Sequence, residues 1–572
     1  MALPFPTVTL ADWRAQVEKD LAGASFEKTL VHLTSEGPSI LPLYTELPES
    51  GTLAMDRDGD PFRICIRHDR GEPDDAVRED LDGGADALWL RSANDLPAEA
   101  DRARTFLVLE ADDTPPRDVI DALALRMTPR TPPTFALTTD PLGLLAQGRI
   151  AATDLPVRYA ALVDAARAVS ARFHGSSVAM ASTLPYHDAG ADGADEIAFA
   201  LATGVAYLGL LLREGLTNDE AARQVALQVA VGRDTFVEVC KLRALRGCWQ
   251  KVLAAADATS PPRTRVHAVC SSRTLTQRDP WVNMLRVTTQ VFAAVLGGAD
   301  LVTPASFDQA LGTPSALGRR VARNTGLVLR EESHLGRVLD PVGGAYYFET
   351  LTDTLAREGW KRFQEIERDG GIADALTSGR VRTRLEAAWR TRMDLVSKRR
   401  TVILGVSEFA NLDEKLPVPP PSPHDPAHVS SEAALPRRRD AEVFEALRTR
   451  AEGRRSRLEA SLVPLGPLAE SRARVGFAAG FLAAGGIRTR EIAEVRGGSL
   501  ACICGSDERY GAEAAGSARA LKAAGVKHVL VAGRPGPLEA SLRDAGVDGF
   551  IFVGCDVAAL LSDLQQVFDD AS

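Results

Sequence analysis

Cysteine is scarce in this sequence of 572 residues and follows no metal-binding spacing. No two cysteines are spaced as Cys-x-x-Cys, and the seven are Cys65, Cys240, Cys248, Cys270, Cys502, Cys504 and Cys555. A disulfide framework or a zinc site usually shows closely spaced pairs, so neither is indicated. The sequence therefore fits a reducing compartment.

Net positive charge and long hydrophobic runs are also missing. The formal net charge is −10 at pH 7, whereas nucleic-acid binding needs clustered Lys and Arg to neutralise phosphates. No apolar run reaches the length of about 20 residues that crosses a membrane. The first residues carry Asp12, Glu18 and Asp20 instead of a basic start and an apolar core. We therefore expect a cytoplasmic protein that binds neither nucleic acid nor membrane.

Hydrophobic residues make up 45% of the chain, enough for large cores, and its length exceeds what one core usually holds. Short apolar runs alternate with helical patterns such as those at residues 158–169 and 195–212. The runs lie at residues 62–66, 87–90, 105–109, 134–137, 177–181, 265–269 and 301–302. This alternation predicts an α/β fold with a parallel sheet, here a (β/α)8 TIM barrel whose remaining strand the pattern does not place.

A proline-rich segment divides the chain. Residues 416–435 contain PVPPPSPHDP, and proline removes hydrogen-bond donors and fixes φ, so this segment is expected to be a linker. His424 and His428 lie in it, and the surrounding prolines argue against a helical metal pair. After a charged helix at 440–458, strands and helices alternate from residue 459 onward. This spacing of alternating strands and helices is typical of a flavodoxin-like, Rossmann-like domain.

The N-terminal segment contains one apolar helical stripe. Thr9 is a candidate N-cap, and the apolar residues Leu10, Trp13, Val17 and Leu21 follow at spacings of three or four. Such a stripe needs a surface to cover it. Two surfaces remain open, the chain's own barrel and a partner subunit.

Several strings between residues 265 and 349 occur in a fixed order. They are His267, Leu275-Thr276, Asp279-Pro280, Asn283, SFDQAL at 306–311, EES at 331–333 and DPVGGAYYFE at 340–349. Together they resemble the acyl-CoA-binding barrel of methylmalonyl-CoA mutases. The string at 238–249, with Glu238 and Lys241 one turn apart, supports the same resemblance, and a structural ion pair is its expected role. The resemblance implies an arm at 1–40, a barrel at 41–410, a linker and helix at 411–458 and a cobalamin-binding-like domain at 459–572.

The cofactor motif of that family is altered here. Mutases of this kind hold adenosylcobalamin through Asp-x-His-x-x-Gly after the first strand of the second domain. An ungapped count from Gly466 puts Leu468, Glu470 and Ala473 at those three positions, and the domain's only histidine is His528. The resemblance therefore implies that adenosylcobalamin belongs to a partner chain and that this motif is degenerate.

The family's barrel site is only partly retained. Tyr186 and His187 match a Tyr-His pair, which is either a hydrogen-bonded pair at a strand end or an acid–base pair. His267 is present, but Val269 stands where active chains have Gln.

Two regions that contact substrate in the family also differ. In the family an Arg binds the substrate carboxylate, and an ungapped count places Gly148 at that position, with Gln147 and Arg149 one position to either side. If Gly148 or Gln147 is the equivalent residue, this carboxylate clamp is lost; if Arg149 is, the clamp is kept. Asp56, Asp58 and Asp60 replace a glycine-, proline- and arginine-rich stretch that helps form the CoA channel in the family. Acids there would repel phosphate, and a solvated turn is the expected role of these residues. The vestigial pocket candidates are thus Tyr186, His187, His267, Gln147 and Arg149, with no residue assigned as catalytic.

The resemblance implies a small, non-catalytic subunit of a heterodimeric adenosylcobalamin-dependent mutase of this family. Its catalytic large subunit would hold cofactor and substrate and interconvert (R)-methylmalonyl-CoA and succinyl-CoA. The alternative is an active subunit for a different acyl-CoA, using Tyr186, His187 and His267 with a cobalamin domain supplied in trans.

Overall fold

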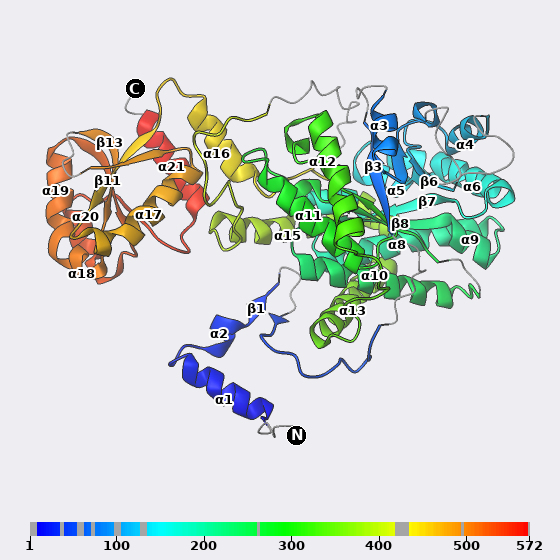
Figure 1. The fold of residues 1–572 in the computed structure, drawn as a ribbon, viewed down its shortest axis with the longest axis horizontal. Helices are drawn as coiled ribbons and strands as arrows, with labels where there is room; N and C mark the ends of the chain where they lie inside the picture. Colours follow the sequence, from blue (N-terminus) through cyan, green and yellow to red (C-terminus); the bar gives the residue numbers. More distant parts are fainter. Residues whose placement is uncertain are drawn as a thin grey trace.

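A closed barrel of eight parallel strands forms the larger part of the molecule (Figure 1). The computed structural model describes residues 8–34, 39–53, 62–69, 75–96, 105–125, 134–259, 263–417, 434–492 and 497–569. The barrel strands are β3 (Arg63–Arg67), β4 (Ala87–Leu90), β5 (Phe106–Leu109), β6 (Phe135–Thr139), β7 (Ser177–Ser182), β8 (Val225–Val231), β9 (Val266–Cys270) and β10 (Leu301–Thr303). Leu301 of β10 pairs with both Arg63 and His267, which closes the ring. The predicted eight-stranded barrel is confirmed.

The strand that the pattern did not place is β8. All seven of its residues are buried, and it begins directly where helix α9 (Asn218–Gln224) ends, with Val225 as the helix C-cap. A helical pattern and a continuous apolar strand therefore run together without a turn signal between them. A periodicity argument cannot separate the two.

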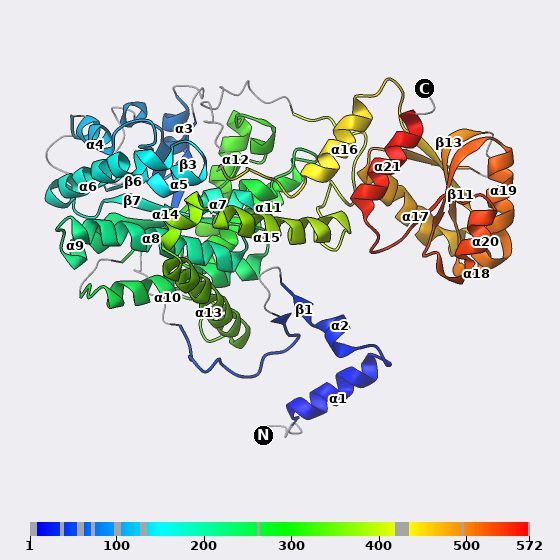
Figure 2. The same ribbon diagram turned by 180° about the vertical axis from the view of Figure 1, so that it is seen from behind.

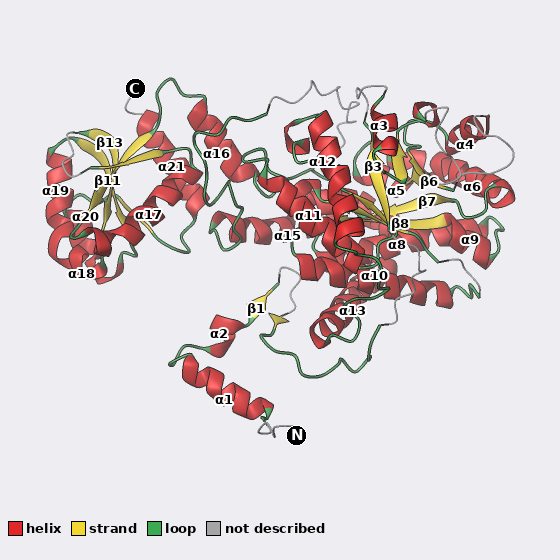
Figure 3. Cartoon of the chain, viewed as in Figure 1, coloured by secondary structure: helices red, strands yellow, loops and turns green. Residues whose placement is uncertain are grey.

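Helices surround the barrel on its outside (Figures 1 and 3). They include α3 (Ala76–Asp82), α4 (Pro116–Leu125), α5 (Pro141–Ala146), α6 (Leu155–Arg172), α7 (Leu184–Ala189), α8 (Gly193–Arg213), α10 (Thr235–Ala255), α11 (Val282–Leu296), α12 (Ala316–Leu327), α13 (Tyr346–Arg368), α14 (Gly371–Thr377) and α15 (Arg380–Ser397). Within the described residues, α8 is the one helix long and apolar enough to cross a membrane, and 72% of that window is buried inside the protein. It packs against β7, β8 and α13, as a core helix does.

The C-terminal unit is a five-stranded parallel sheet with helices on both faces. Its strands are β11 (Glu459–Pro464), β12 (Arg488–Glu491), β13 (Gly498–Cys504), β14 (Val526–Ala532) and β15 (Gly549–Ile551), in the order β12-β11-β13-β14-β15. Its helices include α16 (Glu442–Glu452), α17 (Leu468–Ala484), α18 (Asp507–Arg509), α19 (Ala515–Ala523), α20 (Glu539–Asp544) and α21 (Val557–Asp569). Sequence reasoning missed β12 because this edge strand reads RTRE, without an apolar residue.

The N-terminal arm stands away from the barrel (Figures 1 and 2). Helix α1 (Leu10–Asp20) begins at the predicted cap, since Thr9 forms a capping box with Asp12. No residue of α1 is buried. Trp13 meets Phe26 of the short helix α2 (Phe26–Leu30) edge to face, with ring centroids 6.1 Å apart. The strands β1 (His32–Leu33) and β2 (Ser39–Ile40) follow. Because α1 is unburied and stands away from the barrel, the barrel does not cover the apolar stripe in the described structure.

Residues 434–440 cross the barrel on the side of α5 and α7. The Leu435 N–H donates to the Ala146 carbonyl at 2.8 Å, and the Asp440 N–H donates to the Arg273 carbonyl at 2.9 Å. Leu435 is buried, so this segment forms part of the barrel surface rather than a free connection. Asp56, Asp58, Asp60, His424 and His428, which the sequence analysis considered, lie outside the described residues.

Candidate functional site

A cavity of about 220 Å³ lies at the carboxyl ends of the barrel strands. This is the end at which barrel enzymes of this kind carry their active sites. The cavity brings together the predicted residues Gln147, Arg149 and His187, and Leu435 and Arg437 lie at its edge. Tyr186 and His267 are not among its lining residues in the described part of the chain.

Tyr186 and His267 belong to the packed interior. The Tyr186 ring is fully buried and stacks on Phe199, with ring centroids 4.6 Å apart. His267 Nδ1 lies 3.2 Å from Gln228 Nε2, and its Nε2 lies 2.7 Å from the Thr303 hydroxyl. Burial lowers the pKa of His267 to about 3, so this ring is neutral at pH 7. In this structure Tyr186 therefore packs within the interior, and His267 packs there and is hydrogen-bonded.

His187 lies at the edge of the cavity with both ring nitrogens engaged. Its Nδ1 lies 2.8 Å from Glu196 Oε1 on α8, and its Nε2 lies 2.6 Å from the hydroxyl of Ser271, which follows β9. Burial, and then the nearby Arg273 guanidinium, lowers the pKa of His187 below its usual value. The imidazole is therefore neutral at pH 7 and can accept a proton.

A buried ion network supports this histidine from behind. Lys241 Nζ lies 3.1 Å from Glu196 Oε2 and 2.6 Å from Glu238 Oε2, so the predicted Glu238–Lys241 pair is present. Burial alone would raise the pKa of Glu196, but Lys241 and then His187 lower it. Glu196 is thus ionised and fixed in place. Sequence reasoning missed Ser271 and Glu196 because only the fold brings them to His187.

Arg149, the guanidinium considered from the sequence as a carboxylate clamp, is already paired. Arg149 forms ion pairs with Asp112 and, at 2.9 Å, with Asp113. Although burial lowers the pKa of Arg149, the carboxylates of Asp112, Asp113 and Glu110 together raise it, so the net shift is upward. Gln147 lines the same cavity without a charge. A substrate carboxylate would have to displace two of the chain's own carboxylates to reach Arg149.

Asp140, at the inner wall of the cavity, gives a pH-dependent prediction. Burial raises the pKa of Asp140 to about 7, although the Tyr207 hydroxyl and the Gly143 N–H at 2.9 Å donate to its carboxylate. Because the pKa of Asp140 is higher in the folded than in the unfolded state, protonation of its carboxyl group stabilises the fold. This contribution is complete below the unfolded pKa and is lost as pH rises through 7. The neutral variant Asp140→Asn keeps the helix N-cap and is expected to gain stability relative to wild type from pH 5 to pH 8. The gain should be on the order of 2 kcal/mol.

Urea unfolding of both proteins at the two pH values measures this difference. Other groups with raised pKa, such as buried Glu238, are common to both proteins and cancel. A difference in unfolding free energy that does not change with pH would show that Asp140 is ionised throughout.

The three cofactor positions of the C-terminal unit all lie in helix α17. Leu468 begins the helix and is 58% exposed, and Ala473 is also exposed. Glu470 is held in an ion pair with Arg509 at 2.9 Å. His528 lies on β14, with its Nδ1 3.9 Å from Asp548. Among the described residues no cluster of three His, Cys, Asp or Glu side chains could hold a metal. The residues present thus do not offer cobalamin an imidazole after β11.

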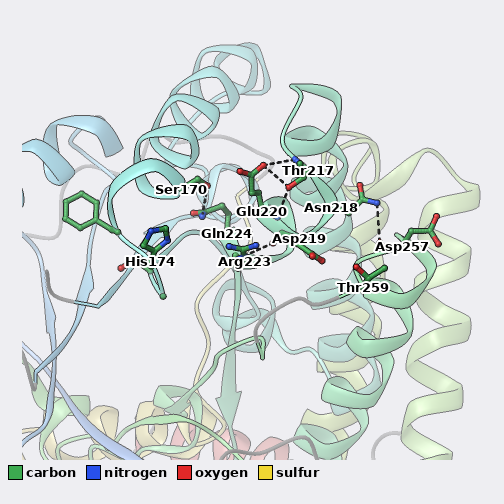
Figure 4. A pocket seen from close by; sticks show the side chains of 13 residues that line it. Ser170, His174, Thr217, Asn218, Asp219, Glu220, Arg223, Gln224, Asp257 and Thr259 are labelled. Atoms are coloured by element: carbon green, nitrogen blue, oxygen red, sulfur yellow. Dashed lines mark hydrogen bonds between the residues drawn. The ribbon is translucent and has the colours of Figure 1, made fainter.

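A second, larger cavity of about 700 Å³ lies at the opposite end of the barrel (Figure 4). Residues 173–176, just before β7, and residues 217–220 and 223–224, just before β8, are among those that line it. Its polar side chains bond to one another, as Gln224 Nε2 does to the Ser170 hydroxyl at 3.2 Å. The amino ends of barrel strands usually serve stability, and no predicted site residue lies here.

Comparison with known proteins gives consistent matches. The family described as methylmalonyl-CoA mutase matches residues 136–463. The chain is 35% identical to the methylmalonyl-CoA mutase small subunit of Streptomyces virginiae, over 98% of this chain and 97% of that protein. It is 36% identical to a probable small subunit of Mycobacterium tuberculosis, over 94% and 92%. It is 32% identical to the small subunit of Propionibacterium freudenreichii subsp. shermanii, over 99% and 96%.

Proposed function

The chain belongs to the methylmalonyl-CoA mutase family, and from this membership we propose that it is the small, non-catalytic subunit of a heterodimeric adenosylcobalamin-dependent mutase. Its partner, the large catalytic subunit, holds the cofactor and the acyl-CoA and converts (R)-methylmalonyl-CoA to succinyl-CoA. The observation that carries the proposal is the contrast within the chain. Similarity to small subunits extends over nearly its whole length, while the cofactor-ligand positions hold Leu468, Glu470 and Ala473.

The C-terminal unit is, in this proposal, a flavodoxin-like domain that has lost its cofactor. The strand order β12-β11-β13-β14-β15 corresponds to 2-1-3-4-5, the flavodoxin-like order, which supports this interpretation. Ligands of such domains bind at the carboxyl ends of the strands. There the cobalt ligand's position is occupied by Glu470, paired with Arg509.

The barrel is proposed to be a relict of the acyl-CoA site. Its cavity of about 220 Å³ is smaller than the roughly 300–1,000 Å³ of pockets that enclose a drug-sized ligand. Arg149 is neutralised by Asp112 and Asp113, which removes the charge that would bind a substrate carboxylate. No observation favours the alternative of an active subunit for another acyl-CoA.

The proposed domain division assigns residues 1–40 to the arm, 41–410 to the barrel, 411–458 to the linker and helix, and 459–572 to the C-terminal domain. The separate hydrophobic clusters of the two units support it. Val396, Ile403 and Val406 pack with α16, α17 and α21, so the end of the barrel segment also contacts the second unit.

Reconstitution of the enzyme from separately purified chains tests the proposed function. We expect no conversion of (R)-methylmalonyl-CoA by this chain with added adenosylcobalamin, and turnover when the large subunit is present. The substitution His187→Gln in this chain should leave the turnover of the folded complex unchanged within about twofold. Turnover by this chain alone, or a loss of at least tenfold in a fully assembled His187→Gln complex, would contradict a non-catalytic role.

A further inference from the structure

The side chains of Ser271, His187 and Glu196 are linked in that order by hydrogen bonds, beside the cavity at the carboxyl ends of the barrel strands. The Ser271 hydroxyl lies 2.6 Å from His187 Nε2, and His187 Nδ1 lies 2.8 Å from Glu196 Oε1. All three residues are at least 98% buried. A nucleophile, a base and an acid that orients the base have this geometry in hydrolases of unrelated folds.

The surrounding charges fix the protonation states that such a set requires. Lys241 Nζ at 3.1 Å and the Thr183 hydroxyl at 3.1 Å both donate to Glu196 Oε2, which leaves Oε1 to His187. An ionised Glu196 holds the imidazole proton on Nδ1. His187 Nε2 therefore carries the lone pair that faces the Ser271 hydroxyl.

The serine and the histidine of this set face the cavity, and the carboxylate does not. Ser271 and His187 both line the cavity of about 220 Å³, whereas Glu196 is not among the lining residues and lies behind the histidine. Arg437, whose side chain is 65% exposed, lies at the outer part of the cavity. A small acyl group fits this volume, and a long acyl chain does not.

We propose that Ser271 is a nucleophile toward short-chain acyl esters and thioesters, with His187 as its general base and Glu196 as a positioning residue. Ser271 Oγ bonds to the acyl carbonyl carbon, and its proton passes to His187 Nε2. The bond from that carbon to the leaving oxygen or sulfur then breaks, and the leaving group takes the proton. Water, deprotonated by His187, attacks the acyl-serine, releases the acid and restores the hydroxyl. The net reaction consumes one water and requires no cofactor.

This activity goes beyond the proposed subunit function and is independent of it. It is measured on the full chain purified alone, without cobalamin or the large subunit. Failure of one proposal would therefore leave the other standing.

Covalent labelling with a fluorophosphonate probe, followed by peptide mass spectrometry, is the primary test. We expect the label on Ser271, with Ser271→Ala and His187→Gln each lowering the labelling rate at least tenfold in chains whose circular dichroism is unchanged. The described contacts assign no backbone donor to an oxyanion, so slow turnover is expected. The chain should hydrolyse p-nitrophenyl acetate at least tenfold faster than p-nitrophenyl octanoate.

Two further variants separate a reactive centre from a structural one. Ser272→Ala removes the neighbouring hydroxyl, which bonds to Asp188 at 3.0 Å, and should change labelling by less than about twofold. Glu196→Gln should slow labelling and shift the acidic limb of its pH profile to lower pH, because the carboxylate that favours protonated His187 is gone. An unlabelled wild-type chain, a label on another residue, or equal labelling in Ser271→Ala would overturn the proposal.

Discussion

Deletion of residues 1–23 is expected to weaken binding to the large subunit at least about 100-fold and to leave the barrel folded. Helix α1 has no buried residue, and of the stripe formed by Leu10, Trp13, Val17 and the C-cap residue Leu21, Trp13 packs edge to face against Phe26 of α2. Burying one large apolar side chain contributes about 1.5–3 kcal/mol. Covering even two of the four would exceed the roughly 2.7 kcal/mol that a 100-fold change requires. Calorimetry with the large subunit measures the affinity.

Point variants on opposite faces of α1 provide the matched control. Trp13→Ala removes a stripe residue and should weaken binding at least about tenfold. Lys19→Ala, on the exposed opposite face, should change the affinity by less than about twofold. A truncated chain that binds with unchanged affinity would show that the arm contributes nothing to the interface.

Replacement of the buried guanidinium of Arg243 by Met is expected to destabilise the barrel by about 3–5 kcal/mol. Arg243, on α10, is fully buried and donates to Asp340 and, at 2.8 Å, to Glu349 at the start of α13. Its removal leaves two carboxylates without their cation, and one of them, Glu349, is itself buried. The urea midpoint at pH 7, followed by circular dichroism, measures the loss.

Arg357→Ala on α13 is the control for this substitution. Arg357 is 65% exposed and pairs with Asp353, and such surface pairs contribute at most about 1 kcal/mol. Adding Glu349→Gln to Arg243→Met should recover part of the loss, since one uncompensated charge is then removed. An Arg243→Met chain as stable as wild type would refute the importance of this network.

The barrel could be predicted from sequence because its strands are short, apolar and separated by helical patterns. Strand β4, at Ala87–Leu90, was predicted to the residue, and the first and last strands within one or two residues. Prediction failed where the local signal is absent. Strand β8 follows a helix without an intervening turn, so no signal marks its start. Strand β12, with the sequence RTRE, lacks the apolar residues that would indicate a strand, which an edge strand does not require.

The site was less predictable because it depends on contacts between distant parts of the chain. His187 was singled out as a candidate, yet its partners Glu196 and Ser271 come from α8 and from the end of β9. Conversely, His267 was a candidate whose nitrogens bond to Gln228 and Thr303 inside the barrel. Residue type indicated possible chemistry, and only the fold determined which side chains reach the cavity.

Titration of adenosylcobalamin into the isolated chain, followed by its visible absorption spectrum, tests the central claim most directly. With Leu468, Glu470 and Ala473 in place of the cofactor motif, we expect no saturable spectral change up to tens of micromolar cofactor. The large subunit should bind the cofactor under the same conditions, as a positive control. Saturable binding to this chain at micromolar cofactor would contradict the account.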